Sequence, residues 1–381
     1  MKLLEYKGKE LLDWYGVPIQ KGVVVESANN IFSAVEELKP PFVVKVQVMA
    51  GGRGKAGGIK FAANVDEAGK VSKSLLGKII KNIVVKKVLI AEKVEVEDEW
   101  YLSVILDRFY KSPMVIFSPL GGVDIEETAK SNPDKIAKIP INPLIGIKDY
   151  DVRYIFQKYS IDNAFFEQFS SILKNLYRLF NEYDCTLVEI NPLVKVIGSS
   201  LIAIDCKIDI DDSSLFRHTD IVEFRKLLDE NEWIIEARKF NFLYIPIDNE
   251  GDITVMSNGS GMLMSSIDLI IKTGQKVRAA LDLGGGATSD RIREAVRIIF
   301  KDEKTKYLFI NIFGGITRCD EVANGVKDAF DSGLKNRTII LRLEGTNKQK
   351  GLKILNQLGE NILTIDSVSE GVKKLESRRL V

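Results

Sequence analysis

The amino-acid sequence predicts an α/β protein in two parts: a mixed α+β part over residues 1–238 and a doubly wound parallel sheet over residues 239–381. The chain of 381 residues is long enough for two or three domains of roughly 150 residues each. From about residue 240, four strand–glycine–helix units follow one another, whereas helices and strands come in less regular order before that point. Strands that alternate with helices at a regular spacing are typical of parallel sheets.

The charge balance argues against nucleic acid or a membrane surface as a partner. The chain has 54 basic and 53 acidic residues, whereas bulk attraction to polyanions needs a strong basic excess. It has no apolar run of about 18 residues, and its first residues are too charged for a signal peptide. Cys185, Cys206 and Cys319 lie far apart, without the spacing of a zinc site or a disulfide framework. We expect a reduced, cytoplasmic protein.

The N-terminal part begins with a predicted helix over residues 3–15, in which apolar residues recur at helical spacing until Gly16 and Pro18 end it. Period-2 and period-3.6 patterns then predict, in order, a strand over 21–27, a helix over 29–38, strands over 40–48 and 58–64, a helix over 64–77 and a strand over 86–96.

The rest of this part is predicted in the same way. Two strands within residues 99–122 are joined by a turn at Lys111–Pro113, and residues 150–183 are helical. The segments expected after them are strands over 185–194 and 200–210 around the linker Ile197–Ser200, a polar loop over 209–220 and a helix over 221–239.

The C-terminal part consists of four units in which a glycine turn separates a strand from a helix. They span residues 253–271, 279–299, 307–330 and 338–358. Open parallel sheets bind their ligands at the carboxyl ends of the strands, where these glycine turns lie.

A glycine-rich loop, AGGRGKAGG, connects two strands of the N-terminal part. Gly52, Gly54 and Gly57 have the spacing of a dinucleotide-binding fingerprint, but that motif needs a helix after the loop to bind the pyrophosphate. A strand-like segment follows here, so the sequence argues against NAD. Glycines that let backbone N–H groups approach oxygen, with Lys45 and Arg53 as cations, favour a flap over a polyphosphate. A ligand-free hairpin tip is the alternative.

Glu189, Asn191 and Asp205 lie on two strands that are otherwise apolar. If these strands pair in antiparallel fashion, the three side chains can approach one another on one surface. Carboxylate and carboxamide oxygens suit Mg²⁺, which keeps its waters and bridges phosphates. Polar residues on the solvated faces of edge strands would fit the pattern equally well.

Two glycine turns of the C-terminal part precede helix N-termini that could hold an anion. Thr317 is the expected N-cap of one helix, with Asp320 three residues on. Thr288 or Ser289 is the expected cap of the other. Ordinary helix starts that bind nothing are the alternative.

The chain has a single histidine, His218, in a polar loop. It has no adjacent acidic partner of the triad type, so we expect a surface residue without a catalytic role. No Ser/His/Asp or Cys/His nucleophile can be assembled elsewhere. The sequence therefore predicts phosphate binding without a nucleophile of its own.

Seven motifs, in order along the chain, resemble the β subunits of ADP-forming succinate–CoA ligases, the succinyl-CoA synthetases. They are VVKVQVMAGGRGKAGGIK, EWYLSVILDR, PLGGVDIEETA, LVEINPLV, LFRHTDI, LDLGGGAT and INIFGGITRCDEVANG. The likeness runs from residue 1 to near the end of the chain. It implies an ATP-grasp domain over residues 1–238, followed by a flavodoxin-like CoA-ligase domain over residues 239–381.

The resemblance also implies roles for individual residues. The nucleotide would be bound by Lys45, Gly52, Arg53, Gly54, Val94 and Glu99, and Mg²⁺ by Asn191 and Asp205. Glu189 matches a catalytic acidic residue near a phosphohistidine. The acid substrate and its phosphate would lie at a site shared with a partner subunit, against Asn258, Gly315, Ile316 and Thr317.

Two positions depart from the family's pattern. Ala91 stands where the family often has glutamate, and Glu92 is one place away, which leaves the choice between ADP and GDP open. Thr317 replaces an apolar residue, although a contact through its backbone N–H would be kept.

The resemblance finally implies a partner and a reaction. An α subunit would carry the phosphohistidine and the CoA site, in a heterodimer or a heterotetramer. Succinyl-CoA would give succinyl phosphate, then the phosphohistidine, and then ATP from ADP, as in the tricarboxylic acid cycle. This partner supplies the nucleophile that the chain lacks.

Three alternatives remain open. The first is the β subunit of a related enzyme such as malate–CoA ligase, and the second is a non-catalytic nucleotide-binding subunit. The third is an ATP-grasp enzyme that joins a carboxylate to an amine, which would not need a second phosphate-binding sheet.

Overall fold

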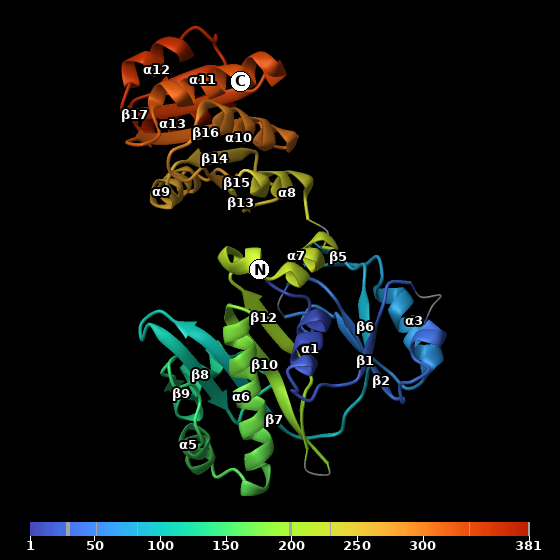
Figure 1. Cartoon of the computed structure of the whole chain (residues 1–381). Helices are drawn as coiled ribbons and strands as arrows, with labels where there is room; N and C mark the ends of the chain where they lie inside the picture. The colour runs from blue at the N-terminus through green and yellow to red at the C-terminus, as the bar shows by residue number, and fades with distance from the viewer. Residues whose placement is uncertain are drawn as a thin grey trace. The chain divides into compact units, whose positions relative to one another are not determined.

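The computed structural model describes residues 1–27, 31–50, 52–81, 83–197, 200–228, 230–334 and 336–379. The chain divides into two compact units, Met1–Lys226 and Leu227–Val381, which are described separately (Figure 1). The division falls inside the single helix expected over 221–239. That expectation is wrong: the structure has two helices, α7 (Thr219–Lys226) and α8 (Glu232–Lys239). They separate because α8 packs with α10 and β13, and Ala237 of α8 is buried in the core of the second unit.

The first unit opens with α1 (Glu5–Trp14) and a four-stranded antiparallel sheet in the order β1-β6-β2-β3. These strands are β1 (Gly22–Val25), β6 (Val88–Glu92), β2 (Phe42–Val46) and β3 (Ile59–Ala62). Apolar side chains of the sheet form one core with those of α2 (Ile31–Ala34) and α3 (Val65–Leu75). Lys45 of β2 lies opposite Ile59 of β3, which confirms that a strand follows the glycine loop.

A second sheet of the first unit has the order β11-β10-β7-β8-β9, with β12 also paired to β10. Its strands are β7 (Val96–Asp107), β8 (Ser112–Ser118), β9 (Ala137–Pro140), β10 (Cys185–Val196), β11 (Ser200–Ala203) and β12 (Cys206–Ile210). The remaining elements of this unit are β4 (Ile79–Ile80), β5 (Ile83–Val84), α4 (Ile125–Ser131), η2 (Pro133–Lys135), α5 (Asp149–Tyr159), η3 (Asn163–Phe165), α6 (Phe166–Glu182) and η4 (Asp212–Arg217).

Two expectations for this region need correction. The helical stretch over 150–183 is divided by η3, because Ser160 leaves α5 in the left-handed conformation with a φ of 53°. The strand expected over 200–210 is broken between Ala203 and Cys206, so that Asp205 leaves the ladder. The sequence also did not predict α4 or β9. Of the linker Ile197–Ser200, residues 198 and 199 lie outside the described residues.

The second unit is a six-stranded sheet in the order β13-β15-β14-β16-β17-β18. All pairs are parallel except β13–β15. The strands from β14 onward therefore have the order 2-1-3-4-5, which is that of flavodoxin-like sheets. The strands are β13 (Leu243–Pro246), β14 (Ile253–Ser257), β15 (Val277–Asp282), β16 (Tyr307–Gly314), β17 (Thr338–Gly345) and β18 (Ile362–Ile365).

Helices cover both faces of this sheet, as the alternation of strands and helices predicts (Figure 1). One core contains side chains of α8, α10 (Ser289–Lys301), α11 (Cys319–Ala329) and α12 (Lys348–Leu355). The short π-helix η5 (Phe330–Leu334) also contributes to it. The other core contains side chains of α9 (Ser260–Ile271) and α13 (Val368–Arg379). Across the described parts of both units, every helix falls short of the length or the apolarity needed to span a bilayer.

Gly325 sets the close contact between α10 and α11. A Cβ at this position would lie 2.5 Å from Ile292 Cβ and would also collide with the Ser289 carbonyl. Both neighbours belong to α10, so a side chain here would push the two helices apart.

We therefore predict that Gly325→Ala lowers the free energy of unfolding of the second unit by about 1–2 kcal/mol. Overpacking costs about 1–3 kcal/mol, which outweighs the gain of about 1 kcal/mol that alanine brings to a helix interior. Hydrogen exchange during urea denaturation would measure the free energy of unfolding of each unit separately.

Gly69→Ala in α3 is the matched control, because no atom lies within 4 Å of a Cβ there. It should stabilise the first unit by about 0.5–1 kcal/mol. Equal effects of the two substitutions would contradict this account of the helix contact.

Candidate functional site

The buried carboxylate of Glu5, at the start of α1, gathers three cations of the first unit. Its Oε1 lies 3.0 Å from Lys45 Nζ and 3.3 Å from Lys9 Nζ, and its Oε2 lies 2.8 Å from Arg53 NH1. Gln47 Nε2 donates to Oε2 at 3.3 Å. We call Glu5, Lys9, Lys45, Arg53 and Asp205 the ion cluster. It brings together two predicted nucleotide-binding residues, Lys45 and Arg53, although they come from different segments of the chain.

Arg53 connects the glycine loop to Asp205, a predicted metal ligand. Its NH2 donates to both carboxylate oxygens of Asp205, at 2.9 and 3.0 Å, while NH1 faces Glu5. The loop turns on itself through bonds such as Gly57 N to Gly54 O, and Gly52 adopts the left-handed conformation with a φ of 68°. Gly52 and Gly54 are exposed, whereas the Arg53 side chain between them is only 12% exposed. The loop therefore points its arginine inward.

The two carboxylates of the cluster have pKa values shifted in opposite directions. Burial by itself would raise the pKa of Glu5, but Lys45, Lys9 and Arg53 together hold it well below its usual range. Burial raises the pKa of Asp205, repulsion from Glu5 adds to this, and Arg53 opposes it. Glu5 therefore carries the negative charge around which the cations are arranged.

Asp205 is adjacent to Asn191, as the antiparallel pairing expected from the sequence requires. β12 pairs in antiparallel fashion with β10, and Asn191 N donates to Asp205 O at 3.2 Å. The Asn191 side chain holds the turn after β8: its Oδ1 accepts from Gly122 N at 2.8 Å, and its Nδ2 donates to Val123 O at 3.1 Å. The same turn contacts Glu99, since a side chain at Gly122 would collide with the Glu99 carboxylate.

A cavity of about 520 Å³ opens beside this turn. It is lined mainly by acidic residues and by the turn itself, and its acidic members are Glu97, Asp98, Glu99, Asp124 and Glu127. Val94, which the resemblance also assigns to nucleotide binding, is half-buried between β6 and β7. Ala91 is buried in β6, and Glu92 is turned toward the Lys39 backbone N–H, 2.9 Å away, so its carboxylate already has a partner.

Glu189 lies two residues before Asn191 on β10 and accepts a hydrogen bond from the Tyr101 hydroxyl at 3.0 Å. Burial raises the pKa of Glu189, and the bond from Tyr101 partly offsets that shift. Burial and the Glu189 charge in turn raise the pKa of Tyr101. The pair sits on the strands β7 and β10, where Glu189 faces Ser103 in register.

In the second unit, two predicted site segments meet at the carboxyl edge of the sheet. Asn258 follows β14 and bonds to Phe313 of β16 in both directions: its Nδ2 donates to Phe313 O, and its Oδ1 accepts from Phe313 N. β14 and β16 flank the point where the strand order reverses, which is where such sheets bind ligands. Gly315 and Ile316 lie exposed in the turn after β16.

Thr317 is buried, and its hydroxyl has a different role from the one expected. It does not cap α11, whose N-cap is Arg318 without a side-chain bond. Its Oγ1 instead accepts from Gly286 N at 3.1 Å and Ala287 N at 3.4 Å, in the turn before α10. Thr288 is the N-cap of α10, but its side chain makes no capping bond.

The N-terminus of α10 is thus occupied by the protein itself. Besides the two bonds to Thr317, Ser289 N donates to Glu321 Oε2 at 3.0 Å. Asp320, expected to pair with Thr317, is bound by Arg318, Asn347 and Lys350, and these contacts hold its pKa well below its usual range, with the Arg318 bond the largest cause. In the other turn, Gly315 and Ile316 are exposed, and Gly315 N donates to Phe313 O at 3.2 Å.

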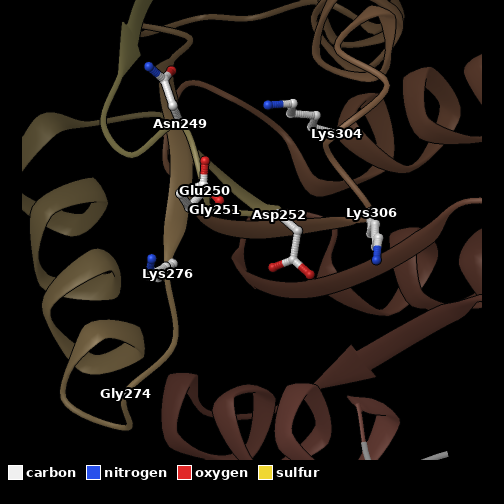
Figure 2. A pocket seen from close by; sticks show the side chains of 8 residues that line it. All are labelled: Asn249, Glu250, Gly251, Asp252, Gly274, Lys276, Lys304 and Lys306. Atoms are coloured by element: carbon white, nitrogen blue, oxygen red, sulfur yellow. The ribbon is translucent and has the colours of Figure 1, made fainter. Parts of the chain in front are cut away.

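Another hollow of the second unit, about 420 Å³, lies at the opposite edge of the sheet (Figure 2). Lys276, Lys304 and Lys306 reach it from segments that precede β15 and β16, with Asp252 among them. Because ligands of such sheets bind at the carboxyl ends of the strands, we do not assign this hollow to the site.

His218 is not the surface residue that we expected. It is buried, its Nε2 lies 2.7 Å from Asp184 Oδ2, and its ring stacks on Tyr183 at 5.1 Å. Its acidic partner lies 34 residues away in the chain, so this pairing could not be recognised from sequence spacing. These contacts fit a structural role.

Glu5, Lys9 and Tyr101 are the residues near the site that sequence reasoning missed. Glu5 and Lys9 are one helical turn apart and share the buried face of α1 with Leu12. Charged residues at helical spacing on an apolar face were the signal that could have revealed them.

Comparison with known proteins agrees with the division of the chain into two different folds. Residues 2–195 match the model of the ATP-grasp domain, and residues 256–374 match that of the CoA-ligase domain. The chain also aligns along its length with ATP citrate lyase from Methanothrix soehngenii, solved with citrate and coenzyme A. The TM-score is 0.73 at 19% identity, covering 99% of both chains, and a likeness at that identity concerns the fold alone.

Curated relatives are much more similar in sequence. The β subunit of ADP-forming succinate–CoA ligase from Alkaliphilus oremlandii is 41% identical, over 98% of this chain and 99% of that protein. The corresponding subunit from Pyrobaculum calidifontis is also 41% identical, and β subunit 2 from Archaeoglobus fulgidus is 40% identical, each over 98% of both chains. The chain therefore belongs to the family of succinate–CoA ligase (ADP-forming) β subunits, which are acid–thiol ligases with an ATP-grasp and a CoA-ligase domain.

Proposed function

We propose that this chain is the β subunit of a succinate–CoA ligase that couples cleavage of succinyl-CoA to ATP synthesis, reversibly and together with an α subunit. The observation that carries the proposal is the ion cluster next to Asn191, within a chain about 40% identical to such β subunits over nearly its whole length. Phosphoryl transfer requires mainly positioning and neutralisation of charge. Cations gathered beside oxygen ligands are suited to both.

In this proposal Lys45 and the loop Gly52–Gly54 bind the nucleotide phosphates, while Val94 and Glu99 bind the rest of the nucleotide. Asn191 and Asp205 hold Mg²⁺. One carboxylate and one carboxamide fit this ion, which is usually bound through one or two carboxylates with waters and substrate phosphates as its other ligands. No group of three acidic, histidine or cysteine side chains in the described part of the chain offers a fuller metal site. The bound ion would neutralise phosphate charge.

The second unit would bind the acid substrate and its phosphate through Asn258 and the turn Gly315–Thr317. Glu189, whose carboxyl pKa is raised by burial, would act beside the phosphohistidine. That histidine is assigned to the α subunit, because the chain's single histidine is buried against Asp184 and Tyr183. CoA binding is likewise assigned to the α subunit.

Co-expression with the α subunit tests the proposal as a whole. The complex should form succinyl-CoA from succinate, CoA and ATP, and neither chain alone should turn over. Succinate should be preferred to malate and citrate, and parallel assays with GTP would establish the base preference. Preference for malate would favour the sister enzyme, and turnover by this chain alone that is lost in His218→Ala would contradict the assignment of the nucleophile.

Removing the Lys45 ammonium should weaken nucleotide binding. We predict that Lys45→Ala raises the Kd of ADP at least tenfold, because a hydrogen bond to a charged group contributes about 1.5–3 kcal/mol. Isothermal titration calorimetry would measure it. Lys60→Ala is the control: Lys60 lies on the neighbouring strand, its ammonium donates to exposed Ser74 at 3.1 Å, and its loss should leave the Kd of ADP within about twofold. Unchanged ADP binding in Lys45→Ala would contradict the nucleotide assignment.

Changing the predicted metal ligands should alter the Mg²⁺ dependence of the complex. Asp205→Asn and Asn191→Ala should lower kcat about 100-fold and raise the Mg²⁺ concentration needed for half-maximal rate, since a ligand oxygen or its charge is lost. Asp13→Asn, on the exposed face of α1, is the control and should leave both kcat and the Mg²⁺ dependence unchanged. Intact activity and Mg²⁺ dependence in both variants would favour the non-catalytic nucleotide-binding subunit.

A further inference from the structure

We propose that Glu5 is a positioning residue for the nucleotide phosphates: its buried carboxylate fixes the Lys45 ammonium and the Arg53 guanidinium in the place where the phosphates bind. The inference rests on the proposed function and adds to it a residue outside the glycine loop, at the start of α1.

The position of Glu5 is itself tightly fixed. α1 packs directly on β12: a Cβ at Gly8 would lie 2.8 Å from Cys206 Sγ, and the Cys206 thiol donates to Glu5 O at 3.5 Å. Leu3 N donates to Ile208 O at 3.0 Å, which anchors the chain just before the helix. As the first residue of α1, Glu5 also lies at the positive end of the helix dipole, which favours a carboxylate there.

The carboxylate of Glu5 is shared between cations that have different surroundings. The side chains of Lys9 and Lys45 are each 4% exposed, and Lys9 also donates to Gln20 at 3.3 Å. Lys45 is tied on its other side to the Ile204 carbonyl, at 2.8 Å, in the break between β11 and β12. Arg53 is the most exposed of the three and belongs to a loop. Glu5 is thus the contact that the strand lysine and the loop arginine have in common.

The charge count of the ion cluster favours an anion as its missing partner. Three cations face two carboxylates, Glu5 and Asp205, so the cluster has one positive charge in excess. When Asp205 serves as a metal ligand, Glu5 is the remaining carboxylate of the cluster. Phosphate oxygens match a lysine and an arginine held side by side, because the guanidinium binds them in bidentate fashion.

A purely structural role explains this arrangement less well. Buried ion pairs are weak sources of stability, since desolvation offsets much of the attraction, and apolar residues of similar size often stabilise a fold more. An arginine from an exposed glycine loop is also an unusual partner for a core carboxylate. A role in arranging cations for a ligand accounts for both observations.

The test compares ligands with and without phosphates, measured on the full chain in complex with its α subunit. Glu5→Gln should raise the Kd of ADP at least tenfold and leave the Kd of adenosine within about twofold. Calorimetry would measure the Kd of ADP, and saturation-transfer NMR would measure the Kd of adenosine. Glu10→Gln, an exposed glutamate of the same helix, is the matched control and should change neither value.

Glu5→Gln alone leaves three cations without their carboxylate and could prevent folding, so a charge-balanced variant accompanies it. Glu5→Gln/Lys9→Gln removes one carboxylate and one cation and keeps the excess charge of the cluster unchanged. It should show the same phosphate-dependent loss. Tight ADP binding by this double variant, or equal losses for ADP and adenosine, would overturn the inference. Failure of the unmodified complex to bind ADP would instead overturn the proposed function.

Discussion

One buried carboxylate organises the first unit. Glu5 connects α1, the strand β2, the glycine loop and, through Arg53, the break before β12, so four separate segments converge on a single negative charge. Buried charges are stable only when they are paired and hydrogen-bonded, and each partner of Glu5 meets this condition. The positions of the loop and of Asp205 follow from that requirement.

In the second unit, the candidate site is positioned by the strand order of the sheet and not by a buried charge. A sheet order of 2-1-3-4-5 leaves one point at which neighbouring strands run to helices on opposite faces, and Asn258 and the turn after β16 meet there. The two units therefore position their candidate site residues in different ways. The first gathers cations and oxygen ligands, whereas the second presents the exposed residues Gly315 and Ile316 in the turn after β16.

Much of this organisation could be predicted from the sequence, because it depends on local patterns. The strand after the glycine loop, the antiparallel pairing around Asn191 and Asp205, and the parallel sheet of the second unit were expected, and the structure agrees. Their signals are period-2 alternation and glycine turns, which are read within a few residues. The helix break near residue 227 was missed, since it depends on α8 packing with the second unit.

The contacts that give the site its chemistry could not be predicted in this way. Glu5 and Arg53 are 48 residues apart, and His218 meets Asp184 across 34 residues. No fixed sequence spacing characterises such long-range pairs, so a local pattern cannot reveal them. The burial of Thr317 was equally hidden, because a threonine after a Gly-Gly turn has the appearance of a helix cap.

Thr317 has a consequence for exchanging parts between related proteins. Its hydroxyl occupies two backbone N–H groups of the turn before α10, and Glu321 occupies a third, so the two turns share their hydrogen bonds. A chimera that received only residues 314–321 from a relative with an apolar residue at position 317 would leave Gly286 N–H and Ala287 N–H without that acceptor. Residues 284–289 and 314–321 thus form a single module for protein engineering.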